Sequence, residues 1–149
     1  NDLEQPQVYS YREAEANGQI KGRFAVGDLY SIYPDNDHRR VSICINVTEL
    51  RGQWFYDMQQ HRGMQFEEHG ALSSINSERY SYKEWKLLNG KLYLYYVDMQ
   101  QVSADRHEFL VEEAEILHLS DEELQLSFLD SIYNCRRQHG LIMLGDSLQ

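Results

Sequence analysis

Histidines and carboxylates are the side chains that most often transfer protons in enzymes, so a search for catalytic chemistry begins with them. The chain has six histidines in 149 residues, and none of them has the spacing of a metal site: His38, His61, His69, His107, His118 and His139. His107 with Glu108, and His118 with Asp121, could form acid–base pairs, but nothing in the sequence orients either pair. Motifs for a nucleophilic serine, a P-loop or a dinucleotide are also missing. We therefore predict no enzymatic activity, no metal ion and no cofactor.

Acidic residues are concentrated in two neighbouring runs, at 112–115 and at 121–123. Such a cluster can bind a cation or can simply form a solvated face. Because Asp and Glu are seldom buried without a partner, the solvated face is the favoured interpretation.

Cys44 and Cys135 are the two cysteines, and they lie near opposite ends of the patterned region. A disulfide between them would close a long loop and stabilise the fold by roughly 4–5 kcal/mol. It would also require an oxidising compartment. Two buried free thiols are the alternative, and the sequence leaves both open.

The net charge of −10, from 24 acids and 14 bases, argues against nucleic acid and anionic membranes as partners. The basic doublets at 39–40 and 136–137 are too small for phosphate-backbone binding. No apolar run approaches the roughly 18–20 residues that span a bilayer. Residues 1–7 are polar and contain no signal peptide, and a lipid anchor upstream of residue 1 is compatible with this start.

The elements that would position these side chains are predominantly strands. Asn89-Gly90 stands between two apolar runs, which is typical of a hairpin with a type I′ turn. From Trp54 onward, about eight short alternating runs follow one another with turns between them. This pattern predicts an all-β fold, an antiparallel meander closed into a barrel. Ser120–Glu123 could cap a helix instead, but the surrounding pattern favours a turn followed by a strand.

The N-terminal region has a different pattern. A helix-like patch covers residues 11–16, and Gly27-Asp28 between runs 21–26 and 29–33 suits a two-residue hairpin loop. Residues 41–48 alternate between apolar and polar side chains, which predicts a half-buried strand.

Several motifs resemble those of bacterial lipocalin-like envelope proteins. Gly52-Gln53-Trp54 is similar to the lipocalin fingerprint, and the runs 63–76 and 82–87 continue the likeness through Asn89-Gly90 and on to about residue 138. The resemblance implies a lipocalin-like barrel in which Trp54 plugs the closed end. It also implies that Arg136 or Arg137, from the last strand, packs on that indole, which would add a cation–π attraction.

Alternation also predicts which side chains point inward. They form either a filled core or the walls of a cavity for one small ligand, because an eight-stranded barrel has little spare interior volume. Tyr93 and Tyr95 would then point outward, where they could contact a protein partner. The predicted inward residues are Trp54, Tyr56, Met58, Phe66, Trp85, Leu87, Leu92, Leu94, Tyr96, Leu110 and Phe128.

We therefore expect three parts: an N-terminal extension (1–45, an arm plus a β-hairpin), a lipocalin-like barrel (46–140) and a tail (141–149). The expected function is a binding protein of the bacterial envelope, in the periplasm or at the outer-membrane surface. It would hold a small apolar ligand near Trp54, Tyr56, Phe66, Trp85 and Tyr96. The alternative is a filled barrel that serves as a structural or protein-interaction module.

Overall fold

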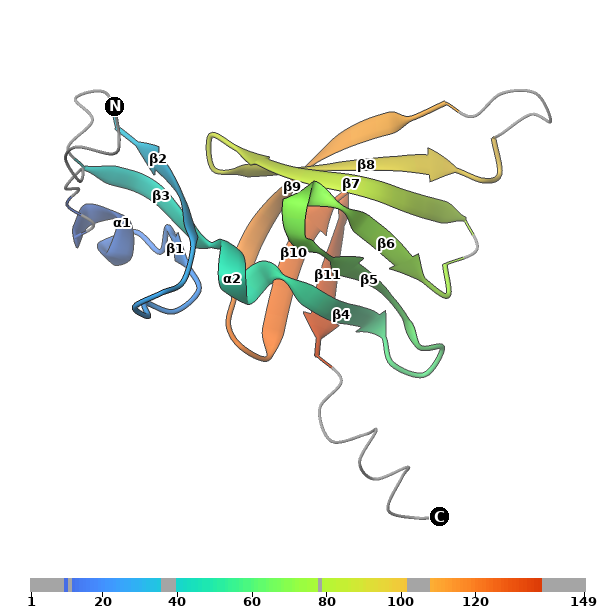
Figure 1. Cartoon of the computed structure of the whole chain (residues 1–149), viewed down its shortest axis with the longest axis horizontal. Helices are drawn as coiled ribbons and strands as arrows, with labels where there is room; N and C mark the ends of the chain where they lie inside the picture. Colours follow the sequence, from blue (N-terminus) through green and yellow to red (C-terminus); the bar gives the residue numbers. More distant parts are fainter. Residues whose placement is uncertain (1–9, 11, 36–39, 78, 102–107, 138–149) are drawn as a thin grey trace, which may run out of the picture.

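A computed structural model describes residues 10, 12–35, 40–77, 79–101 and 108–137. Its main feature is an eight-stranded antiparallel barrel that follows a short N-terminal unit (Figure 1). The predicted all-β meander is confirmed. The strands of the barrel are β4 (Gly52–Asp57), β5 (Arg62–Phe66), β6 (Leu72–Ile75), β7 (Tyr80–Leu88), β8 (Lys91–Asp98), β9 (Leu110–Leu119), β10 (Glu123–Phe128) and β11 (Ser131–Arg136).

Each strand of the barrel pairs with the next along the chain, except β6 with β7, and the last strand returns to the first. Arg136 of β11 pairs with Phe55 of β4, which closes one side of the barrel. The seam lies between β6 and β7, where the only described backbone bridge joins Ala71 and Glu84. Across this seam Ser74 Oγ donates to the Tyr80 carbonyl and accepts from the Tyr82 amide, both at 2.8 Å. The barrel is therefore nearly, but not fully, closed by backbone pairing.

The central hairpin forms as predicted. Asn89 and Gly90 have φ values of 54° and 79°, the positive values that a type I′ turn requires. Between β9 and β10, Ser120 Oγ accepts from the amides of Glu122 and Glu123 in a tight turn. A strand follows that turn, so the helical alternative for this segment is wrong.

The N-terminal unit differs from the prediction. β1 (Ile20–Lys21) and β2 (Tyr30–Pro34) do not form a hairpin with each other; they pair with opposite edges of β3 (Val41–Asn46), β1 in parallel and β2 antiparallel. Gly22, at φ +100°, turns the chain out of β1 before a second strand can begin. The hairpin therefore joins β2 to β3, and residues 22–29 form a loop.

Helices are few and short. α1 (Arg12–Ala16) covers one face of the small sheet, and η1 (Glu68–Gly70) joins β5 to β6. α2 (Val47–Leu50) replaces the last part of the strand predicted over 41–48, because the Asn46 side chain accepts from the Glu49 amide and starts a helical turn.

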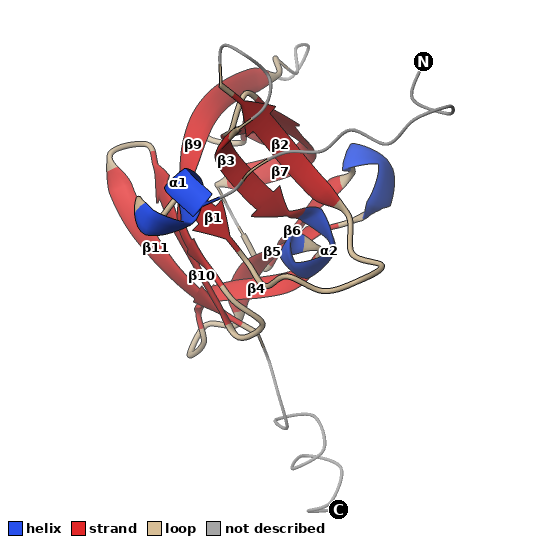
Figure 2. Cartoon of the chain, turned by 90° about the vertical axis from the view of Figure 1, so that its left-hand side faces the viewer, coloured by secondary structure: helices blue, strands red, loops and turns tan. Residues whose placement is uncertain are grey.

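The N-terminal unit packs on one end of the barrel, the end where β4 begins and β11 finishes (Figures 1 and 2). Lys21 Nζ donates to the Leu117 carbonyl in β9, at 3.3 Å. A Cβ built on Gly90 would lie 2.5 Å from Ile43 Cδ1, so the β7–β8 turn rests directly on β3. We call the end that the N-terminal unit covers the closed end of the barrel, and the opposite end, which this unit does not cover, its open end.

Candidate functional site

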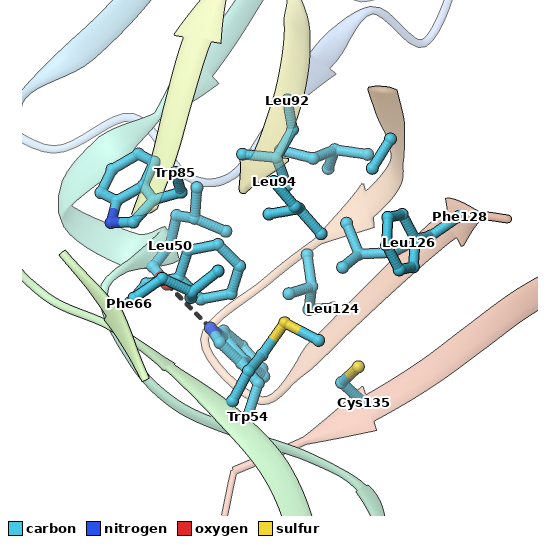
Figure 3. Packing of buried hydrophobic residues seen from close by; sticks show 14 of the residues in the cluster. Leu50, Trp54, Phe66, Trp85, Leu92, Leu94, Leu124, Leu126, Phe128 and Cys135 are labelled. Carbon is cyan, nitrogen blue, oxygen red and sulfur yellow. Dashed lines mark hydrogen bonds between the residues drawn. The ribbon is translucent and has the colours of Figure 1, made fainter. Parts of the chain in front are cut away.

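The closed end is built around the Trp54 indole. Trp54 is fully buried, and its Nε1 donates to the Leu50 carbonyl at 2.8 Å (Figure 3). The Arg137 guanidinium carbon lies 3.9 Å from the centre of the indole ring. Arg136 instead points to the outer surface, where it pairs with Glu123 at 2.8 Å. Of the two candidates for the contact with Trp54, the structure therefore places Arg137 there.

Arg137 also satisfies the carbonyl groups around the end of α2. Its guanidinium donates to the carbonyls of Glu49, Arg51 and Asp121, at 2.9 Å for Arg51 and 3.1 Å for Asp121. Burial lowers the pKa of this guanidinium from its ordinary value, without removing its charge at neutral pH. One side chain from the end of β11 thereby ties together the helix, the β9–β10 turn and the indole.

The half of the barrel next to this end is filled with apolar side chains. Phe66 packs edge-to-face on Trp85, with ring centres 5.5 Å apart, and Trp85 Nε1 donates to the Glu67 carbonyl at 3.0 Å. Buried leucines fill the space between these rings and Trp54 (Figure 3). Three of the five predicted ligand-binding residues, Trp54, Phe66 and Trp85, are thus brought together in a packed core. The leucines are Leu50, Leu92, Leu94, Leu124 and Leu126.

In the open half, tyrosines from several strands pack on one another. Tyr96 packs edge-to-face on Tyr80 and on Phe128, with ring centres 5.2 and 5.9 Å apart. Tyr56 meets Tyr133 edge-to-face at 5.3 Å. Tyr82 and Tyr96 are buried, whereas Tyr56, Tyr80 and Tyr133 are partly exposed. We call these six rings the aromatic cluster: Tyr56, Tyr80, Tyr82, Tyr96, Phe128 and Tyr133.

Burial raises the pKa of four hydroxyl groups in the aromatic cluster, those of Tyr56, Tyr82, Tyr96 and Tyr133. Burial raises the pKa of Tyr82 far above its ordinary value, and the nearby hydroxyls of Tyr56 and Tyr133 raise it further. Burial likewise raises the pKa of Tyr133 and of Tyr96. The cluster therefore offers aromatic faces and neutral hydrogen-bonding groups.

An ion pair stands at the rim of the cluster. The Asp98 carboxylate, which is 6% exposed, lies 3.3 Å from Arg79 Nη2. The Arg79 guanidinium carbon is 5.0 Å from the centre of the Tyr80 ring. The two charges compensate each other at the edge of the aromatic surface.

Sequence alternation missed Tyr80 and Tyr82 because β7 contains a bulge. The pairing with β8 shifts between Tyr82 and Glu84. Tyr82 and Trp85 therefore both point inward although they are three residues apart, an odd spacing that would put them on opposite faces of a regular strand. Met58 and Leu110, which alternation placed inside, are 43% and 37% exposed, because Met58 lies in the turn after β4 and Leu110 is the first residue of β9.

Both cysteines are buried free thiols in the structure. Cys135 lies in the barrel core, and Cys44 lies in the small cluster under α1. The disulfide that the sequence left open is therefore not formed. Burial raises the pKa of the Cys135 thiol to about 12 and also raises that of Cys44.

The candidate acid–base residues do not assemble into a site within the described residues. His118 faces Glu123 at 3.9 Å on the outer surface rather than Asp121. His38, His107 and His139 lie outside the described residues. The part of the chain that the structure describes holds no group of three or more potential metal ligands. It also holds no helix that is long and apolar enough to cross a membrane.

The chain is thus a small antiparallel β-barrel protein whose strands follow one another as a meander and whose closed end is sealed by Trp54 and Arg137. Residues 46–136, more than half of the chain, match the family described as Lipocalin-like, and the chain belongs to that family. It is similar in fold to a lipocalin-like protein from Bacteroides thetaiotaomicron, with 24% identity and a TM-score of 0.49 over 58% of this chain and 94% of that one. A search of curated proteins found no match.

Proposed function

We propose that this chain is a non-enzymatic binding protein that holds a small apolar or amphipathic ligand at the open end of its barrel. The aromatic cluster is the observation that carries this proposal. Its rings offer apolar faces, and its hydroxyls can both donate and accept hydrogen bonds. The closed half is filled, so the ligand contacts Tyr56 and Tyr96, while Trp54, Phe66 and Trp85 form the packed floor beneath it.

The chemistry of the cluster favours a ligand that is neutral where it meets the barrel. Burial disfavours the charged form of the Tyr82 hydroxyl, as the raised pKa of Tyr82 indicates, and the rim charges of Arg79 and Asp98 already pair with each other. An isolated charge in such a surrounding would lose hydration without gaining a partner.

Binding of a neutral apolar dye, N-phenyl-1-naphthylamine, followed by its fluorescence, tests this proposal. We expect wild-type protein to bind the dye, and the Tyr133→Ala and Tyr56→Ala variants to bind it at least about tenfold more weakly, the factor that corresponds to 1.4 kcal/mol. Tyr93→Ala, on the outer face of β8, is the matched control and should bind normally. Equal affinity in all four proteins would overturn the location of the site.

We further propose that the protein acts in the bacterial cell envelope, either in the periplasm or at the outer-membrane surface. Its parts would be an N-terminal extension (1–45), the barrel (46–140) and a tail (141–149). The resemblance to lipocalin-like envelope proteins and the family match over 46–136 support this. Cell fractionation of the native host with an antibody against the barrel tests the location: recovery in the cytoplasmic fraction would contradict it.

A second function is favoured by one surface feature, an apolar strip on the outside of β8 and β9. Tyr95 stands opposite Val111 in the strand register, and Val111 is 50% exposed. Phe109 and Met99 continue the strip and are 67% and 48% exposed. Protein-interaction modules present patches of this kind, and loss of a partner on Tyr95→Ser without loss of stability would support this alternative.

A further inference from the structure

A groove lies outside the barrel beside the seam between β6 and β7. Its volume is about 590 Å3, and its lining includes Arg51, His69, Trp85, Lys86, Leu87 and Leu88. It is separated from the aromatic cluster by the packed half of the core, because Trp85 and Leu87 lie at the closed end of β7. Neither the family match nor the proposed ligand site accounts for it.

One wall of the groove is an unpaired strand edge. β7 is the last strand in the sheet order, and beyond the bridge at Glu84 none of the described strands pairs with its free edge. In the hairpin, Leu88 and Lys91 flank the type I′ turn and so form a hydrogen-bonded pair, which leaves Leu87 in a pair that is not hydrogen-bonded to β8. The backbone N–H and C=O groups of Leu87 therefore point toward the groove.

The rim of the groove is cationic in a protein whose net charge is −10. Arg51 and Lys86 stand on it, and Arg51 Nε is a buried donor without a hydrogen-bond partner among the described residues. Among the described residues, the carboxylate that pairs with this guanidinium is that of Glu68, 3.9 Å away and 69% exposed. Within the described part of the chain, the Arg51 charge therefore has a weak, solvated counter-ion.

We propose that this groove binds an extended peptide that adds as a short strand to the free edge of β7. Its backbone pairs with Leu87, its apolar side chain covers Leu88, which is 59% exposed, and its carboxylate lies against Arg51. Strand addition explains the open edge, and charge complementarity selects a peptide with a C-terminal or side-chain carboxylate next to an apolar residue.

Amide NMR of the full chain with three probes tests this inference. The probes are acetyl-Leu-Val-Leu with a free carboxylate, the same peptide as its C-terminal amide, and decanoate. We expect the carboxylate peptide to shift the Leu87 amide resonance, and the amide form to bind about tenfold more weakly. In Arg51→Gln the two peptides should bind equally, whereas Arg62→Gln, at the opposite end of the barrel, should preserve the difference.

An unmoved Leu87 resonance would overturn strand addition, and an equal affinity of the two peptides for wild-type protein would overturn the role of Arg51. Decanoate that binds the groove as tightly as the peptide would show that backbone pairing contributes nothing, which also contradicts the proposal. Because the dye site lies at the other end of the barrel, dye binding by Arg51→Gln should remain normal, so the two proposals succeed or fail separately.

Discussion

Trp54 is the residue on which the closed end most depends. Its indole is fully buried between α2, Arg137 and the leucines of the core. Truncation to Ala would leave a cavity and should cost about 3–5 kcal/mol in the free energy of unfolding, measured by urea denaturation. Met58→Ala, at an exposed residue just after the end of the same strand, should change it by less than about 0.5 kcal/mol. A cost below about 1 kcal/mol for Trp54→Ala would contradict the plug.

Ionisation of the Cys135 thiol makes the free energy of unfolding depend on pH in the alkaline range. Its pKa is raised from 9.0 to about 12 in the folded protein, so between these values the folded state keeps a proton that the unfolded state has released. Stability contributed by the neutral thiol is complete below pH 9 and is lost as the pH rises toward 12. Wild-type protein should therefore lose more stability over this window than Cys135→Ala, measured by urea unfolding at each pH. Parallel losses would contradict a buried, neutral thiol.

Gly22 lies directly after β1, where the chain needs a positive φ and has no room for a side chain. A Cβ there would lie 2.6 Å from Asn46 Cβ and 2.9 Å from Glu49 Oε1, and φ is +100°. Gly27 has a similar φ of +96° with nothing within 4 Å of its Cβ position. Gly22→Ala should therefore destabilise the protein by at least about 1 kcal/mol more than Gly27→Ala, since both share the backbone cost. Equal melting temperatures of the two variants would show that the loop does not pack on Asn46 and Glu49.

Among the elements, the β7–β8 hairpin has two roles, because its turn reverses the chain and also packs on Ile43 of β3. Replacing Asn89-Gly90 with Val-Val would force two β-branched residues into positive φ, and a side chain at position 90 would collide with Ile43. We expect a loss of about 2 kcal/mol or more, seen as a lower melting temperature. Unchanged melting would contradict both the turn type and the docking of the turn on β3.

The barrel strands could be predicted from the sequence because alternation, turn residues and spacing agree from Trp54 to Arg136. The N-terminal unit could not be predicted, because nothing in the local sequence shows that β1 and β2 each pair with β3 rather than with each other. Their placement depends on contacts distant in sequence, such as Asn46 Nδ2 donating to the Arg23 carbonyl and to Asp28 Oδ2. The bulge in β7 likewise leaves no mark in an alternating pattern, and it hid Tyr80 and Tyr82 from the candidate site.

At the scale of the whole molecule, the barrel has two unlike halves. The closed half is packed with tryptophan, phenylalanine and leucine and is covered by the N-terminal unit. The open half holds tyrosines that pack on one another and on Phe128. This asymmetry is the reason for proposing a binding function and for proposing a ligand site opposite α2.

Native mass spectrometry of the full chain, purified gently from its native host, tests whether the open half holds a ligand. We expect a reproducible extra mass that disappears on denaturation and is absent from the Tyr133→Ala variant but retained by Tyr93→Ala. A bare mass for the wild-type protein, or an adduct that all three proteins retain equally, would contradict it.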